Sequence, residues 1–270
     1  MLTDHRDRQA GNLTAVSGAE HHDTKQILKR SVERAPTANR EKIVMIRRWK
    51  MTVAAAAMLV LTTAGMAATP AVRLRAGNVE YRDADGHVKP ITSGGGYREA
   101  VLSADGRRIA FIHIDTPPPY ESMPNTTSLW VADLVTGKMR RLLSSRADKN
   151  PERSLASFQH PRFSLGGGFV YIDAEAWATS NAVHQIRVAT SAERFVIDGS
   201  TLGIIRTGPY RGYLLVGRHK YHPAPEGGSY DPVSVVRPDG TEVLMVPGSD
   251  EDDGAQSVPA WLERNGWTAF

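Results

Sequence analysis

The sequence predicts an all-β fold built from repeated four-stranded antiparallel sheets. Three observations support this: a strand-turn-strand phrase that recurs along the chain, two interleaved series of tight turns, and complementary hairpins at the two ends of the repeat region. The phrase first appears at residues 100–115 as AVLSADGRRIAFIHID. It returns at 160–175 and, cut short, at 258–270. Runs of β-branched and aromatic residues around a Gly-containing turn are typical of β-hairpins.

The turns alternate between two series, and members of one series recur about every 50 residues, a period typical of blades in a β-propeller. The first series joins the first and second strands of each unit, and the second joins the third and fourth. Three complete units are expected, at residues 98–144, 160–199 and 202–247. The first series consists of Asp105-Gly106, Gly166-Gly167, Arg211-Gly212 and Asn265-Gly266, and the second of Asp85-Gly86, Thr136-Gly137, Ser191-Ala192 and Asp239-Gly240.

The two ends of the repeat region are expected to complete one further blade. It opens with a lone hairpin, NVEYRDADGHVKPIT, and closes with another, PAWLERNGWTAF. Pairing of these halves would give a closed four-bladed ring and remove an exposed sheet edge. The strand at Val79–Arg82 or Val88–Ile91 would then share a sheet with Trp267–Phe270. The alternative is an incomplete larger propeller.

The phrase LSADGRRIAF followed by SLWVADLVTGKMRRL resembles the WD-like repeats of TolB-type β-propellers. It is also similar to the propeller half of prolyl-oligopeptidase-type enzymes. The resemblance is strongest over residues 79–145, and later copies are degenerate: SLGGG lacks the Asp-Gly of the pattern. The resemblance implies the fold more than a function, because propellers host many unrelated activities.

The segment before the repeats has the features of an export leader. Residues 1–44 are polar and low in aromatics, as expected of a disordered leader, and Met45 is a candidate for the true start. Residues 45–67 combine the basic MIRRWK, an apolar run and Gly-Met-Ala, which predicts a signal peptide cleaved after Ala67. A signal anchor is the alternative. Residues 68–78 are expected to be a linker, and 79–270 the propeller.

The balance of basic and acidic residues after the leader argues against a nucleic-acid-binding surface there. The first 50 residues carry 11 Lys and Arg against 6 Asp and Glu, whereas the remainder carries 22 against 23. The basic character therefore belongs to the leader. A periplasmic or secreted location is expected, or a membrane-anchored one if the leader stays uncleaved. The chain has no cysteine, and a chain of this size can bury an adequate core without disulfides.

No catalytic constellation is evident in the sequence. It contains no G-x-S-x-G nucleophile elbow and no G-x-x-x-x-G-K-[ST] phosphate loop. His219 and His222 form an H-x-x-H pair, but at a strand end residues i and i+3 face oppositely, so zinc is not expected. His113 and Asp115 share a strand face, and a cross-strand hydrogen bond explains this pair as well as catalysis does. No cofactor, metal or catalytic residue is assigned.

Loop length gives a clue to a binding face. The connections between second and third strands, and between blades, are long, and they gather on the face opposite the tight turns. Long loops on a rigid scaffold often carry binding residues, and aromatic side chains there make good anchors. We therefore expect a non-catalytic module that binds an extracytoplasmic protein or an envelope glycan. The alternative is an enzyme of the lyase or glycosidase type at the channel mouth. The candidate binding residues are Tyr120, Glu121, Trp177, Tyr221, His222 and Tyr230.

Overall fold

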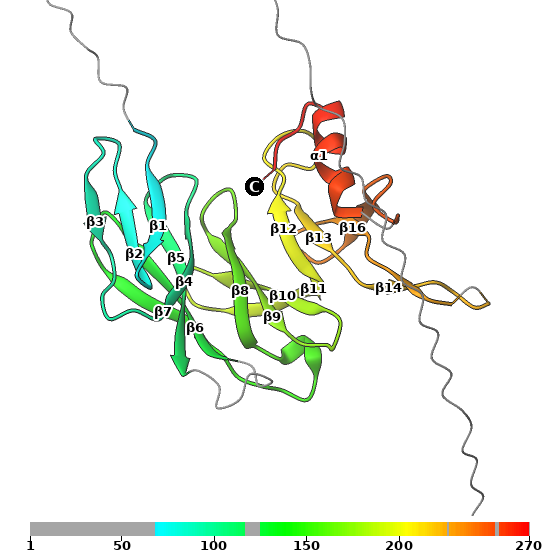
Figure 1. The fold of residues 1–270 in the computed structure, drawn as a ribbon, viewed down its shortest axis with the longest axis horizontal. Coiled ribbons are helices and arrows are strands. Elements are labelled where there is room, and N and C mark those ends of the chain that lie inside the picture. The colour runs from blue at the N-terminus through cyan, green and yellow to red at the C-terminus, as the bar shows by residue number, and fades with distance from the viewer. Residues whose placement is uncertain (1–67, 117–124, 226, 252–253, 270) are drawn as a thin grey trace, which may run out of the picture. The chain divides into compact units, whose positions relative to one another are not determined.

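The computed structural model of the protein describes residues 68–116, 125–225, 227–251 and 254–269. The leader and its cleavage site lie outside these residues. The described chain forms a three-stranded sheet followed by three four-stranded antiparallel sheets, each a meander of neighbouring strands (Figure 1). We call these four-stranded sheets the first, second and third blades, and they confirm the predicted all-β propeller-type fold.

The three-stranded sheet contains β1 (Ala71–Arg75), β2 (Asn78–Arg82) and β3 (Val88–Pro90), in that order. The expectation that residues 68–78 form a linker is wrong for β1, which pairs antiparallel with β2 along its whole length. Val72 packs against the buried cluster that contains Val79. The short alternation of apolar residues in β1 is therefore sufficient to place this strand in a sheet.

The first blade has the predicted order β4-β5-β6-β7. Its turn at Asp105-Gly106 is held by the Asp105 carboxylate, which accepts hydrogen bonds from Ser103 Oγ at 2.6 Å and from the Arg107 backbone at 3.1 Å. Such side-chain contacts to local backbone favour tight turns. The strands are β4 (Tyr97–Leu102), β5 (Arg108–Thr116), β6 (Thr126–Asp133) and β7 (Met139–Ser144).

The second blade follows a short 3₁₀ helix, η1 (Pro151–Arg153), and has the order β8-β9-β10-β11. Its turns lie where the two series place them. The strands are β8 (Ala156–Phe163), β9 (Phe169–Glu175), β10 (Asn181–Arg187) and β11 (Glu193–Asp198).

The third blade has the order β12-β13-β16-β17, and a separate two-stranded hairpin is inserted between β13 and β16. That hairpin occupies the long loop predicted between the second and third strands. The blade strands are β12 (Ser200–Ile204), β13 (Leu214–Gly217), β16 (Val233–Val236) and β17 (Glu242–Met245), and the hairpin strands are β14 (Lys220–Tyr221) and β15 (Ser229–Tyr230).

The C-terminal segment corrects the prediction of ring closure. Residues Gly254–Arg264 form helix α1, not a strand. Ala269 then forms an antiparallel bridge with Ile205, and the Arg206 backbone N–H donates to Thr268 O at 2.7 Å. Within the described residues the chain end thus extends the third blade, and the sheet of β1–β3 contains no C-terminal strand. The closed ring by paired half-blades is therefore not found in this part of the chain.

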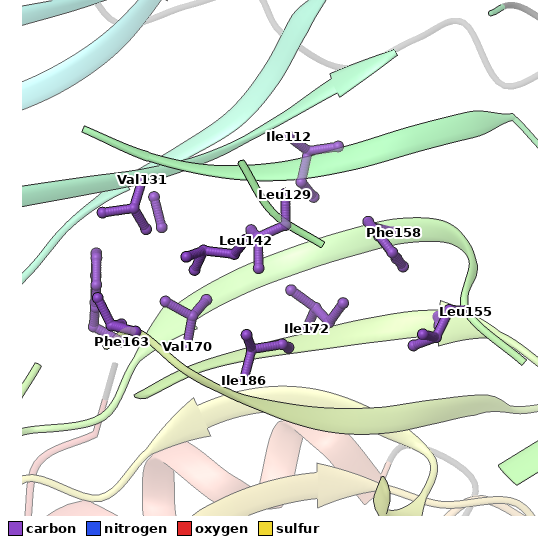
Figure 2. Packing of buried hydrophobic residues seen from close by; sticks show 13 residues of the cluster. Ile112, Leu129, Val131, Leu142, Leu155, Phe158, Phe163, Val170, Ile172 and Ile186 are labelled. Atoms are coloured by element: carbon purple, nitrogen blue, oxygen red, sulfur yellow. The ribbon is translucent and has the colours of Figure 1, made fainter. Parts of the chain in front are cut away.

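The main core lies between the first and second blades, where Ile112 and Leu129 meet Ile172 and Ile186 (Figure 2). All four side chains are fully buried. A second cluster joins the second blade to the third, and includes Val183 and Val216. Because successive blades share apolar cores, the loops at their ends are held on a rigid framework.

Candidate functional site: an aromatic groove between the second and third blades

The structure places the predicted binding residues in three groups. Trp177 and Tyr221 line one groove, which we call the aromatic groove. His222 and Tyr230 line a different cleft. Tyr120 and Glu121 lie outside the described residues. The structure thus brings Trp177 and Tyr221 together and places His222 and Tyr230 apart from them, and the binding role of all these residues stays a prediction.

The β14–β15 hairpin separates these groups by strand alternation. Tyr221 is paired with Ser229 in the hairpin, and Lys220 with Tyr230. Successive side chains of a strand point to opposite faces, so Tyr221 faces one side of the hairpin while His222 and Tyr230 share the other. The His222 and Tyr230 rings stack with centroids 4.5 Å apart. His219 and His222 accordingly line different clefts, as the strand-end argument predicted.

The aromatic groove has a volume of about 540 Å³ and runs along strand β11. Trp177 is 37% exposed and Tyr221 is 69% exposed, so both rings are open to a ligand. Trp177 comes from the β9–β10 connection of the second blade, and Tyr221 from the inserted hairpin of the third. The lining residues are Glu152, Trp177, Thr179, Ser180, Phe195, Val196, Ile197, Asp198, His219, Tyr221 and Gly240.

Two further rings lie in the groove: Phe195, which sequence reasoning missed, and His219, which it considered only as half of an H-x-x-H pair. Phe195 of β11 meets Trp177 edge to face, with centroids 6.5 Å apart. His219 meets Tyr221 at 5.0 Å, nearly perpendicular. Edge-to-face pairs of this kind fix the orientation of exposed rings. Phe195 could have been found only by knowing that β11 faces the hairpin of the next blade, which no local pattern shows.

Polar contacts anchor the groove on the third-blade side. The His219 ring and the Asp231 carboxylate form a hydrogen bond of 2.7 Å through Nδ1. Arg218 forms ion pairs with Asp198 and with Glu242, the latter at 2.6 Å. Burial alone would raise the pKa of Glu242, but hydrogen bonds from Lys220 and Ser234 outweigh it and hold that pKa below its usual value. Glu242 therefore stays ionised and fixes the base of the hairpin.

Gly240 closes the groove at the turn between β16 and β17. It has a positive φ of 96°, and a Cβ atom there would lie 2.2 Å from the Val196 carbonyl oxygen. Only glycine allows this turn to approach β11 so closely. The Asp239-Gly240 turn predicted from the sequence thus also shapes the groove.

A second cluster was also missed, and it joins the first strands of the three blades, β4, β8 and β12, to β9. His160 on β8 hydrogen-bonds through Nδ1 to the buried Asp173 carboxylate at 2.9 Å, and Asp173 also accepts from the Thr201 backbone. The backbone N–H of His160 donates to Glu99 of β4. The hydrogen bond with Asp173 raises the pKa of the His160 imidazole above its usual value. We call these four residues the His160 cluster.

Backbone distortion marks the same region. Glu99, Ser157 and His160 all have positive φ values of 46–51°, which are uncommon for residues other than glycine. The β4–β5 and β8–β9 registers shift at these positions. Two nearby buried atoms, Arg98 Nε and Thr201 Oγ1, make no hydrogen bond with the described residues. The adjoining cavity, which Arg162 borders, has a volume of only about 50 Å³.

Two other features of the surface carry charge. The tight-turn face has a groove of about 630 Å³ between the first and second blades, lined by Arg108, Lys138, Arg140 and Arg187 with Asp133 as its acidic member. The exposed turn after β2 brings Asp83, Asp85 and His87 within reach of one metal ion. Asp83 already caps that turn by accepting two backbone hydrogen bonds, which explains its position without a metal. The His113 ring and the Asp115 carboxylate form a hydrogen bond of 2.7 Å within β5, and not across strands.

Comparisons with known proteins show no family for the chain. No protein-family model matches it, and no curated protein matches it by sequence. Among solved structures, it is similar to Porphyromonas gingivalis dipeptidyl peptidase 4, with a TM-score of 0.46 and 10% identity over 66% of this chain and 31% of that one. It is similar to the tricorn protease with a TM-score of 0.46 and 13% identity, over 66% and 15% of the two chains.

A third similar structure is the β-propeller domain of the Trilobed protease from Pyrococcus furiosus, with a TM-score of 0.40 and 14% identity over 62% of this chain and 47% of that one. The chain thus spans less than half the length of each of these three proteins. The three blades are identified from the strand pairing within this chain. No helix in the described part of the chain is long and apolar enough to cross a membrane.

Proposed function

We propose that the protein is an exported binding module, and that its partner docks in the aromatic groove between Trp177 and Tyr221. The observation that carries this proposal is the convergence of two exposed rings, from separate blades, on one concave site. Exposed aromatic anchors in a preformed concavity are typical of binding hot spots. Because shared apolar cores hold the second and third blades together, little ordering is needed when a partner binds.

Catalysis at the His160 cluster is the second candidate function. A buried carboxylate that orients a histidine through Nδ1 is the arrangement used by general bases. His160 has this arrangement, and its side chain is 47% exposed. The adjoining cavity of about 50 Å³ is much smaller than usual ligand pockets. The cluster also ties β8 to β4 and β12, which accounts for its polar contacts structurally. We therefore favour binding.

The proposal is tested by binding of the purified protein to arrays of peptides and envelope glycans. Replacing Trp177 and Tyr221 together by Ala should abolish capture of any ligand that the wild-type protein retains, because each hot-spot ring contributes about 2 kcal/mol or more. Val135→Ala is the matched control, since Val135 is 67% exposed on the tight-turn face. Circular dichroism should show an unchanged fold in all variants.

Two results would contradict the proposal. One is normal capture by the Trp177→Ala, Tyr221→Ala double variant. The other is turnover of a glycan or peptide by the wild-type protein that is lost in His160→Gln, which would establish the catalytic alternative instead.

A further inference from the structure

We infer that the aromatic groove recognises a cation, namely the Lys or Arg side chain of an extended segment in a partner protein. The inference rests on the proposed function and specifies the chemistry of its ligand. It follows from the composition of the groove lining, which combines aromatic rings with carboxylates and contains no Lys or Arg.

The rings provide the first part of the argument. Trp177, Phe195, His219 and Tyr221 approach the groove from two blades, paired edge to face at 6.5 Å and 5.0 Å. The faces of the Trp, Tyr and Phe rings carry negative electrostatic potential, and they attract a cation positioned within about 6 Å of the ring centre. The same type of contact already occurs within this protein, where the Arg187 guanidinium lies 4.7 Å from the Phe169 ring centre.

The carboxylates provide the second part. Glu152 is exposed at the rim, and its side chain makes no ion pair within the described residues. Asp198 also lines the groove, but Arg218 already neutralises it. Asp231 lies behind His219 and is 79% exposed. The groove therefore has one uncompensated carboxylate at its rim and a second just behind its wall, which favours a positively charged ligand.

A contrast within the molecule makes the charge preference specific. The groove on the tight-turn face is lined by four basic side chains and one acidic side chain. A basic segment would be repelled there and attracted to the aromatic groove. An N–H-bearing cation suits the rim better than a quaternary ammonium, because Glu152 can accept hydrogen bonds from Lys or Arg.

The test is a titration of the purified protein with the pentapeptide Gly-Gly-Arg-Gly-Gly, acetylated and amidated. Binding is followed through the indole N–H resonances, of which that of Trp177 is assigned by its loss in Trp177→Ala. The matched ligand has citrulline in place of Arg, which keeps the shape and removes the charge. We expect the Arg peptide to shift the Trp177 resonance saturably, and the citrulline peptide to bind about tenfold more weakly.

Two variants separate charge from packing. Glu152→Gln should weaken binding of the Arg peptide several-fold, roughly the worth of one partly exposed ion pair, and should reduce its salt dependence. Glu263→Gln is the control, because it removes the same charge from the exposed side of helix α1. Tyr221→Ala, which keeps the Trp177 reporter, should abolish the saturable shift of the Trp177 resonance.

Each alternative result has a defined meaning. Equal binding of the Arg and citrulline peptides would overturn the cation inference while leaving the groove as a binding site. Tighter binding of tetramethylammonium than of the Arg peptide would overturn the assignment to a protein side chain. If no peptide or glycan from the arrays shifts Trp177, the proposed function itself fails.

Discussion

Individual side chains in this protein explain why the first strands of its blades are irregular. His160 adopts a φ of 51°, and its ring is held by the fully buried Asp173. That carboxylate has two hydrogen-bonding partners, the imidazole and the Thr201 backbone N–H, which its two oxygens share. A buried carboxylate is tolerated only when it is hydrogen-bonded in this way. The strained backbone of His160 is thus supported by contacts to neighbouring strands.

This contact predicts a specific pH dependence of stability. The pKa of His160 is raised in the folded protein, chiefly by its hydrogen bond to Asp173. A raised pKa means that the contribution is complete below the unfolded pKa of about 6.5, and is lost as pH rises through the higher folded pKa. The difference in unfolding free energy between wild type and His160→Gln should therefore shrink with rising pH above about 6.5.

The measurement is urea unfolding of both proteins across that range, together with an NMR titration of the imidazole. Asp173→Asn should bring the pKa of His160 back down toward its ordinary value, because the amide carries no negative charge. A wild-type His160 pKa at or below about 6.5 would contradict the interpretation.

At the scale of elements, the C-terminal helix shows how local patterns compete. Val258, Trp261 and Leu262 follow the spacing of one helix face, and all three are buried against the third blade. The same residues also fit the pattern of a short alternating strand before the Asn265-Gly266 turn. The helix forms because its apolar face can pack on Val235 and Val246, both fully buried. A strand in this position would expose part of that apolar set.

Leu262→Ala tests whether the helix is part of the folded core. The side chain is 5% exposed, so its truncation should lower the free energy of unfolding by roughly 2–5 kcal/mol. The neighbouring Glu263→Ala is exposed and should change stability by no more than about 0.5 kcal/mol. Thermal unfolding of the two variants makes the comparison. Equal melting temperatures would show that α1 does not pack as described.

At the scale of the whole molecule, the described chain is a series of sheets in which each blade shares an apolar core with the next. The chain end joins the third blade through the Ile205–Ala269 bridge. The leader lies within residues 1–67, which the structure does not describe. Export is accordingly a proposal that rests on the sequence of residues 45–67.

The leader makes a prediction for the mature protein. In a host that secretes it, the chain should be recovered from the periplasmic or culture fraction with an N-terminus near Ala68, because Gly65-Met66-Ala67 provides the small residues that a signal peptidase reads. N-terminal sequencing measures this. A variant with Ala67→Phe should remain unprocessed, whereas Ala68→Ser should be cleaved normally. Full-length wild-type chain in washed membranes would instead support the signal anchor.

The sequence by itself determined the blades. Turn residues such as Asp105-Gly106 and Asp239-Gly240 encode their geometry locally, and strand alternation around them encodes which face is buried. It also indicated that Trp177 and Tyr221 are exposed between blade strands, although Tyr221 lies on strand β14 and not in a loop. These features depend on residues close together in the chain, so local patterns were sufficient to predict them.

Tertiary structure decided the rest. Whether residues 258–264 form a helix or a strand depends on the surface available for packing, and whether the chain ends meet depends on which sheet edge accepts Ala269. The aromatic groove unites Phe195 and Gly240, and the His160 cluster unites Glu99 and His160, which lie 61 residues apart. Contacts at such separations follow from how neighbouring blades are stacked, and no window of sequence contains that information.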